Sequence, residues 1–349
     1  MSAQKVFLIG PGFIGGEVLD LLLQKNYAVT TLIRRQAAAA SFHDLGVQTV
    51  IGTIDDKSII QKQVENSDIV IHTATADHLP SVEAVLDGIT ARAHTGQTTI
   101  YIHTSGTSLL ADGAHGDSTN ETIFDDAKPQ TLLNALPDSA AHREIDLAII
   151  NAQKALGPKA KMAIMTPPLI YGVSTREKRL SIQLPTMMRF SVKHGYAGHV
   201  GKGVAVWNQV HVKDLARGYL TLLDWLEKTP GEQVLADSDL YCFCENGQEL
   251  SWGECAAAIG EALAKAKKIP SAQPRTIPRE HYGDLFGEYS GVVIGSNSRS
   301  RAIRLRQLGW EPKEKGTIQS LIEDEIPLIL QETGPFKGYS APVASGDTK

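Results

Sequence analysis

The chain has 349 residues, of which 42% are hydrophobic and 21% charged, and its formal net charge is −5. These values are ordinary for a soluble globular protein, and the length favours one large domain with a smaller lobe. The sequence has no basic stripe of the kind that binds nucleic acid, and no apolar run approaches the roughly 20 residues that cross a bilayer.

The N-terminus and the cysteines favour a cytoplasmic protein. Met1 to Lys5 lead directly into a predicted strand, which leaves no room for a signal peptide. Cys242, Cys244 and Cys255 are too few, and odd in number, for a disulfide framework. We therefore expect no metal site, and we interpret Cys242 and Cys244 as half-buried thiols in a strand.

Short apolar runs alternate with helical periodicity through the first 170 residues. The runs predict strands at Lys5–Ile9, Ala28–Ile33, Val47–Ile51, Asp68–Thr73, Thr98–Thr104 and Lys161–Thr166. The periodic stretches predict helices at Phe13–Gln24, Pro80–Ala93 and Ser139–Leu156, with a short helix around Ala37–Ala40. Strands that are apolar throughout are typical of sheets covered on both faces. The predicted fold class is α/β, with a Rossmann-type doubly wound parallel sheet.

One connection, from Gly106 to Asp138, is unusually long and has little periodicity. A stretch of this length in a compact domain is usually functional or mobile. Its acidic residues are most simply interpreted as solvated; they are Asp112, Asp117, Glu121, Asp125 and Asp126.

After Tyr171 the pattern becomes mixed and predicts a smaller α/β lobe. Helices are expected at Pro185–Lys193, Val212–Leu226, Trp252–Ala266 and near Ile318–Gln331, strands near Val204–Val206 and at Gln233–Leu235, and a loop at Pro270–Pro278. We divide the chain into a Rossmann domain at 1–170, a substrate-binding lobe at 171–332 interleaved with the core, and a flexible tail at 333–349.

Three glycines stand between the first strand and the first helix, at Gly10, Gly12 and Gly15. Glycines at this spacing allow a tight turn, close approach of the backbone to a pyrophosphate, and close packing of helix on strand. Free N–H groups at the start of the helix then face the phosphates. The pattern predicts a dinucleotide site that includes Gly10, Gly12, Phe13, Ile14 and Gly15.

The end of the second predicted strand indicates which dinucleotide binds. An NAD site usually places an acid about 20 residues after the glycines, but Arg34 and Arg35 stand here instead. Because a guanidinium can grip a 2′-phosphate, the pair favours NADP, with NAD as an alternative; a solvated basic pair is the other interpretation. We further expect Asp55 to bond the adenine amino group, and Thr73 and Ala74 to lie beside the cofactor.

Four segments of the chain match one superfamily in order. They are Gly-Phe-Ile-Gly at 12–15, Ile-His-Thr-Ser-Gly-Thr at 102–107, Pro-Pro-Leu-Ile-Tyr-Gly at 167–172 and Val-His-Val-Lys-Asp-Leu-Ala at 210–216. With these motifs the chain, over roughly residues 4–330, resembles the short-chain dehydrogenase/reductase superfamily in its extended or atypical branch, the epimerase/dehydratase and NmrA-like relatives. A homodimer is common in the superfamily, but nothing in the sequence demands one.

The resemblance implies roles for residues at strand ends. Ser105 takes the place of the catalytic Ser/Thr, whose hydroxyl bonds a substrate oxygen. Thr107 is the alternative if the alignment shifts, and a Ser-Gly turn without a catalytic role is another. Pro167, Pro168 and Leu169 would line the nicotinamide end of the cofactor, whereas Tyr171, His211 and Asp214 are interpreted as structural.

The chain departs from the superfamily at the acid. The superfamily has a Tyr followed four residues later by a Lys, near the start of a helix, and this sequence has no such pair. His142 and Asp146 stand at the corresponding place, and their spacing puts them on one helix face. Our hypothesis is that His142 transfers the proton and Asp146 orients it. The alternative is an exposed ion pair on a helix that has lost its chemistry.

These residues predict an NADP(H)-dependent oxidoreductase that acts on a carbonyl or secondary alcohol of a small organic molecule. Ser105 would polarise the oxygen and His142 would manage the proton. Two alternatives stay open at this point. A redox sensor would bind the dinucleotide and signal to a protein partner, and an epimerase or dehydratase would hold NAD(P) without consuming it.

Overall fold

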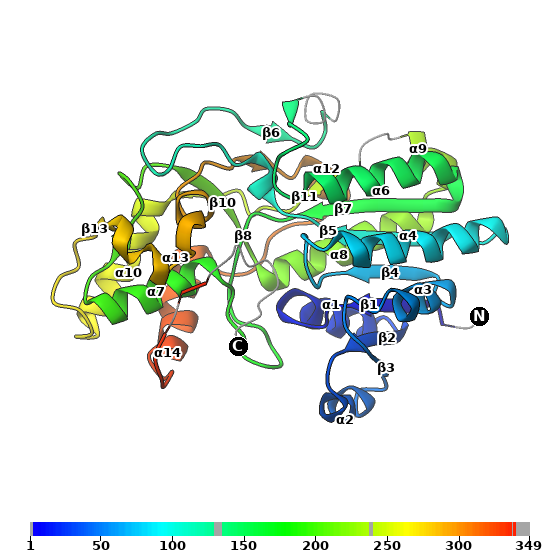
Figure 1. Ribbon diagram of the computed structural model, residues 1–349, viewed down its shortest axis with the longest axis horizontal. Helices are drawn as coiled ribbons and strands as arrows, with labels where there is room; N and C mark the ends of the chain where they lie inside the picture. The colour runs from blue at the N-terminus through cyan, green and yellow to red at the C-terminus, as the bar shows by residue number, and fades with distance from the viewer. Residues whose placement is uncertain (1–2, 129–134, 237–239, 337, 340–349) are drawn as a thin grey trace.

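The computed structural model describes residues 3–128, 135–236, 240–336 and 338–339. At its centre is a seven-stranded sheet in the order β11-β7-β5-β4-β1-β2-β3, and every pair of neighbours is parallel (Figure 1). The strands are β1 (Lys5–Ile9), β2 (Ala28–Ile33), β3 (Gln48–Ile51), β4 (Ile69–His72), β5 (Thr99–Thr104), β7 (Ala160–Thr166) and β11 (Tyr241–Phe243). The predicted doubly wound sheet is confirmed. Its strand order reverses between β1 and β4, which is where such sheets form a ligand crevice.

Helices cover both faces of the sheet. On one face α1 (Phe13–Gln24) packs against α8 (Val212–Lys228), and on the other α4 (Leu79–His94) packs against α3 (Lys57–Glu65) and α6 (Arg143–Leu156). Side chains alternate along β5, so Thr104 points to α8 and bonds the Tyr219 hydroxyl at 2.5 Å. Ser105, the next residue, therefore points to the opposite face, toward α6.

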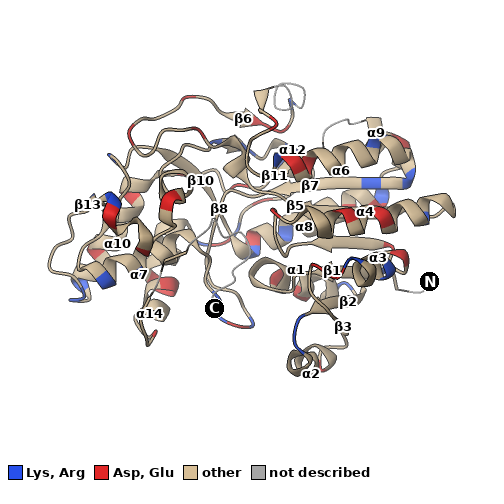
Figure 2. Ribbon diagram, viewed as in Figure 1, with Lys and Arg blue, Asp and Glu red and all other residues tan. Residues whose placement is uncertain are grey.

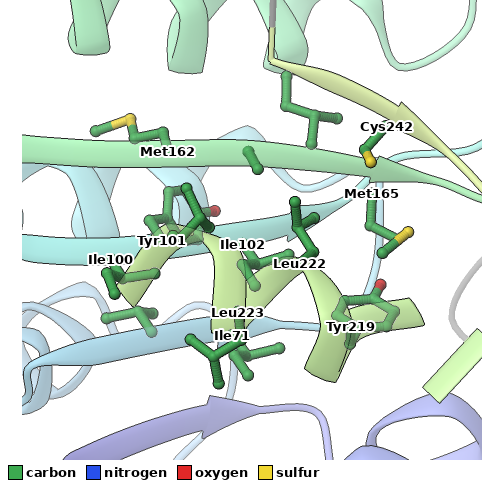
Figure 3. Packing of buried hydrophobic residues seen from close by; sticks show 14 of the residues in the cluster. Ile71, Ile100, Tyr101, Ile102, Met162, Met165, Tyr219, Leu222, Leu223 and Cys242 are labelled. Carbon is green, nitrogen blue, oxygen red and sulfur yellow. The ribbon is translucent and has the colours of Figure 1, made fainter. Parts of the chain in front are cut away.

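The larger hydrophobic core lies on both faces of the sheet, and α8 covers part of one of them. Tyr219 of this helix lies near Met165 and Leu223 lies near Ile71 (Figure 3), and all four are completely buried. Full burial of an apolar side chain of this size contributes about 1.5–3 kcal/mol. Cys242 of β11 belongs to the same core, so this thiol lies in a strand as predicted but is buried more deeply than expected.

The second lobe has a buried core of its own (left side of Figure 1). Its strands are β8 (Leu169–Tyr171), β10 (Val206–His211) and β12 (Glu249–Ser251) in one sheet, with β9 (Gly198–His199) paired to β13 (Arg275–Thr276). Its helices include α7 (Gln183–His194), α10 (Trp252–Lys265), α11 (Ser290–Val293), α13 (Thr317–Ser320) and α14 (Ile326–Ile329). The Rossmann core also draws on residues between 210 and 234, between 240 and 244, and between 302 and 310, so the chain returns to it after residue 170.

Several predicted elements differ in the structure. The strand predicted at Gln233–Leu235 lies inside helix α9 (Gly231–Ala236), because a short apolar run does not distinguish a strand from a helix. The strand expected near Val204–Val206 begins only at Val206, as β10. The final predicted helix is broken into α13, a π-helical turn at Leu321–Glu325 and α14, since Pro327 has no N–H to donate.

The long acidic connection is bonded to the rest of the molecule, so its interpretation as solvated is wrong for two of its acids. Asp126 is 1% exposed and accepts backbone N–H bonds from Phe243 and from the first two residues of α12 (Ile303–Gln307), at 2.8–3.0 Å. Asp112 accepts two bonds from Asn297. In the same connection β6 (Phe124–Asp125) pairs with β14 (Ser300–Arg301). Residues 129–134 of the connection lie outside the described residues.

Charged residues of both signs are interspersed along the elements (Figure 2). In the part of the chain that the structure describes, no helix is long and apolar enough to cross a membrane. Of the tail predicted at 333–349, residue 337 and residues 340–349 lie outside that part. Tyr339 is described, and its ring stacks on Phe286 with the centroids 5.6 Å apart.

Candidate active site

The glycine turn between β1 and α1 is shaped by contacts that leave no room for side chains. Gly10 has a φ of +91°, and a Cβ atom on it would lie 2.5 Å from the backbone of Ala74. A Cβ atom on Gly15 would lie 2.1 Å from the carbonyl oxygen of Gly10 and 2.5 Å from Thr73 Oγ1. The Thr73 hydroxyl donates to that same carbonyl at 2.7 Å. The glycines therefore let β1, α1 and the end of β4 meet at the crevice.

The start of α1 is open to an anion. Gly12 is the N-cap residue and makes no side-chain cap bond, and the N–H of Gly16 donates to its carbonyl at 2.7 Å. The N–H groups of Phe13, Ile14 and Gly15 precede that bond, so the helix itself offers them no acceptor. Together with the partial positive charge at a helix N-terminus, they suit a pyrophosphate. This cradle fits a dinucleotide.

The residues predicted for the adenosine end stand at the ends of β2 and β3. Arg34 and Arg35 are exposed directly after β2, on the blue stretch that leads toward α2 (Ala39–His43) in Figure 2. Asp55 is also exposed, and its Oδ1 lies 3.0 Å from Nε2 of His78. Their roles toward the ribose phosphate and the adenine remain predictions.

Ser105 belongs to a buried polar network on the α6 side of the sheet. Its hydroxyl donates to Asp146 Oδ2 at 2.9 Å, and the Tyr241 hydroxyl donates to the same oxygen at 3.0 Å. Arg143 donates to the Tyr241 oxygen at 2.8 Å. Asp146 is completely buried, and its Oδ1 has no hydrogen-bond partner among the described residues. Asp146 thus fixes the rotamer of the Ser105 hydroxyl.

Burial raises the pKa of Asp146 from the ordinary 3.8 to about 6, although nearby positive charge and its two hydroxyl donors oppose the shift. Because the folded state favours the protonated carboxyl, this group's stabilising contribution is present below pH 3.8 and is lost as the pH rises to about 6. The difference between these two pKa values corresponds to about 3 kcal/mol.

We therefore expect Asp146→Asn, which keeps an acceptor oxygen, to gain stability relative to the unchanged protein as the pH rises from 4 to 7. The gain should approach 3 kcal/mol, the free energy of roughly two pKa steps. Urea unfolding at several pH values measures it, with the exposed Asp44→Asn as control. Parallel pH profiles for Asp146→Asn and the unchanged protein would contradict the expectation.

His142 lies at the start of α6 and not within it, so the helix predicted from Ser139 begins only at Arg143. Its φ is +65°, and its carbonyl accepts the first helical N–H bonds, from Ile145 and Asp146. Such a left-handed conformation is uncommon for residues other than glycine, and here it marks the boundary between the loop and the helix. Because His142 is the N-cap residue and not a helical one, the i,i+4 rule for residues inside a helix does not apply to His142 and Asp146.

The hydrogen-bond partner of His142 is Asp77 and not Asp146, which corrects the predicted pair. His142 Nδ1 bonds Asp77 Oδ1, while its Nε2 lies 2.5 Å from the Ser108 hydroxyl. Only 10% of the His142 side chain is exposed. The imidazole also lies over the turn after Ser105, since a Cβ atom on Gly106 would be 3.3 Å from Nε2. His142 therefore lies next to the turn that follows Ser105, but its hydrogen-bond partners are Asp77 and Ser108.

The residues that join the two lobes are engaged in hydrogen bonds and packing between parts of the protein. The indole N–H of Trp207 donates to Thr107 Oγ1 at 3.1 Å, so this alternative to Ser105 is engaged with the second lobe. The carbonyl of Pro167 accepts the N–H of Thr107 at 2.9 Å. Leu169 is 2% exposed and packs into the core of the lobe. A place for Pro167 and Leu169 beside a nicotinamide remains a prediction.

Tyr171 and Asp214 anchor the last third of the chain. The Tyr171 hydroxyl donates to the Lys315 carbonyl at 2.9 Å. The Asp214 carboxylate accepts the backbone N–H groups of Lys313 and Glu314 at 2.7 and 3.1 Å. The His211 side chain accepts the N–H of Lys213 and caps α8. These contacts are those of structural residues.

Sequence reasoning missed Asp77, Ser108 and Tyr241. Asp77 is 65 positions before His142, and Tyr241 is 95 positions after Asp146. Neither pair has a spacing signal, since the contacts arise only when the segment after β4, the end of β5 and the first residue of β11 come together at α6.

The fold and the glycine turn define a Rossmann-type dinucleotide-binding protein. A family model described as "NAD dependent epimerase/dehydratase family" matches residues 7–236. The chain belongs to this family, and its fold is that of the extended short-chain dehydrogenases/reductases.

Among similar proteins, the oxidase ucsJ of Acremonium sp is 29% identical over 97% of this chain and 99% of its own length. A ketoreductase of Stigmatella aurantiaca that acts on a farnesylated dihydroquinoline oxide is 24% identical over 30% of this chain and 34% of its own. Among solved structures, UDP-glucose 4-epimerase of Thermotoga maritima aligns with a TM-score of 0.64 and 15% identity, covering 94% of this chain and 100% of its own. The names of the first two relatives, an oxidase and a ketoreductase, support an oxidoreductase-like role.

Proposed function

We propose that the protein is an NADP(H)-dependent oxidoreductase that interconverts a carbonyl and a secondary alcohol on a small organic molecule. The observation that carries the proposal is a pair of turns at the carboxyl edge of one parallel sheet. The glycine turn after β1 suits a dinucleotide, and after β5 the Ser105–Gly106 turn lies under the imidazole of His142. The relatives named as an oxidase and a ketoreductase support the reaction class. A bound nicotinamide would supply or accept the hydride.

The chain's own residues would handle the substrate oxygen and its proton. Ser105 donates to Asp146, so its lone pairs are free to accept from a substrate hydroxyl, and a rotation of the hydroxyl lets it donate to a carbonyl. Asp77 fixes the ring of His142 so that Nε2 faces the Ser108 side of the turn. From there the imidazole can exchange a proton with the substrate oxygen.

The cofactor assignment is tested by replacing the basic pair. We expect the double variant Arg34→Ala/Arg35→Ala to bind NADPH about 10- to 100-fold more weakly and NADH unchanged, because only the 2′-phosphate uses charge-assisted bonds to the guanidinium groups. Fluorescence titration with both nucleotides measures this. Lys25→Ala, an exposed charge at the far end of α1, is the control.

Equal weakening of both nucleotides, or no change in either, would contradict the NADP assignment. Failure of the unchanged protein to bind NADPH and NADH alike would overturn the proposed function. With binding established, the oxidation of NADPH by a panel of ketones and aldehydes tests the reaction.

A further inference from the structure

The loop between β8 and α7 lies beside the start of α1 and places a guanidinium at the glycine turn (Figure 1). Arg179 Nη1 is 3.2 Å from the position that a Cβ atom on Gly12 would take. The Arg179 side chain is 46% exposed and pairs with Glu177, 65% exposed, in the same loop. Because exposed ion pairs contribute little, this guanidinium is available to a more strongly bound anion.

The loop is anchored to the helix that carries the turn. Glu17 of α1 is 7% exposed and accepts the backbone N–H and the hydroxyl of Thr175, at 2.5 and 3.0 Å. Arg176 bonds Asp20, three positions further along the same helix, through two of its nitrogens. These bonds fix the loop against the helix independently of the Arg179 side chain.

The loop also closes on itself at the base of Arg179. The N–H of Ser174 donates to the Arg179 carbonyl, and the N–H of Arg179 donates to Ser174 Oγ, both at 2.9 Å. The backbone of Arg179 is thereby held in place, and only its side chain has to reorient to leave Glu177. A guanidinium placed in this way needs little ordering to bind a ligand.

We propose that Arg179 binds the pyrophosphate of the dinucleotide, on the side opposite the N–H groups of Phe13 and Ile14. The inference rests on the proposed function, since it assigns a further residue to the same site. A helix N-terminus supplies only about half a positive charge, whereas a pyrophosphate carries two negative ones. The planar fork of arginine matches two phosphate oxygens, which completes the neutralisation. The pyrophosphate would then lie between α1 and the loop that leads into the second lobe.

The test compares nucleotides that share the pyrophosphate with one that lacks it. We expect Arg179→Gln to raise the Kd values of NADPH, NADH and ADP-ribose by similar factors of about 10- to 100-fold. This is the loss of affinity typical of one charge-assisted hydrogen bond. Adenosine 2′-monophosphate, which has no pyrophosphate, should bind as before. Arg179→Lys should lose less, because it keeps the charge without the fork. Calorimetric titration gives each Kd, and Lys178→Gln, an exposed neighbour in the same loop, is the matched control.

Two results would overturn the inference while leaving the proposed function intact. One is an Arg179→Gln variant that binds NADPH and ADP-ribose as tightly as the unchanged protein. The other is an equal loss of affinity for adenosine 2′-monophosphate, which would mean that the substitution disturbs the whole site. If the unchanged protein bound none of the nucleotides, the proposed function would fail first and the inference with it.

Discussion

Gly15→Ala should abolish NADPH binding at concentrations that saturate the unchanged protein, whereas Gly16→Ala should leave it intact. The new Cβ at position 15 would lie 2.1 Å from the Gly10 carbonyl oxygen and 2.5 Å from Thr73 Oγ1, so β1, α1 or the end of β4 must move. Overpacking of this kind costs about 1–3 kcal/mol of stability. A displacement of about 1 Å at the turn is enough to weaken an interaction that depends on exact positioning by roughly 100-fold.

The neighbouring glycine provides the matched control. A Cβ atom on Gly16 would lie 3.9 Å from the Pro11 carbonyl oxygen, which is ordinary contact. Since alanine is the better helix former, Gly16→Ala should stabilise the protein by about 0.5–1 kcal/mol. Nucleotide titration and urea unfolding of both variants measure the two effects. Tight NADPH binding by Gly15→Ala would show that the cofactor does not use this turn.

The parts of the fold that could be predicted are those determined by residues close to one another in the sequence. The strand β1, the glycines and the helix α1 are contiguous, so periodicity and conformational freedom suffice to place Gly10 and Gly15 at a crevice. The Ser105 position follows from the same logic, because a strand end in a parallel sheet points to the crevice. These predictions depend on neighbours in sequence.

The partners of His142 and Asp146 could not be predicted because they depend on a backbone conformation and on distant strands. The i,i+4 argument assumes that His142 lies inside the helix, but its φ of +65° makes it the last residue before α6. Asp77 reaches it from the end of β4. The burial of Asp126 could not be predicted for a related reason: its three N–H donors come from residues more than a hundred positions away, and nothing local shows that an acid is buried.

His142→Ala should lower the rate of carbonyl reduction by about 100- to 10,000-fold, the range typical of a lost general acid, while NADPH binding stays unchanged. Asp77→Asn should reduce the rate less, because the imidazole remains and only its orienting bond is weakened. Single-turnover reduction of a ketone found in the substrate screen measures the chemical step. His94→Ala, an exposed imidazole at the far end of α4, should have no effect.

Double variants test whether Asp77 acts through His142 and whether Asp146 acts through Ser105. If Asp77 acts only through His142, Asp77→Asn should not lower the reduction rate any further in a His142→Ala background. In the same way, the loss of reduction rate in Asp146→Asn should disappear in a Ser105→Ala background, because Asp146 would affect the reaction only by holding the serine hydroxyl. The opposite pattern, with Asp146 coupled to His142, would restore the pairing that the helical spacing suggests. The network seen here would then not be the one that operates during catalysis.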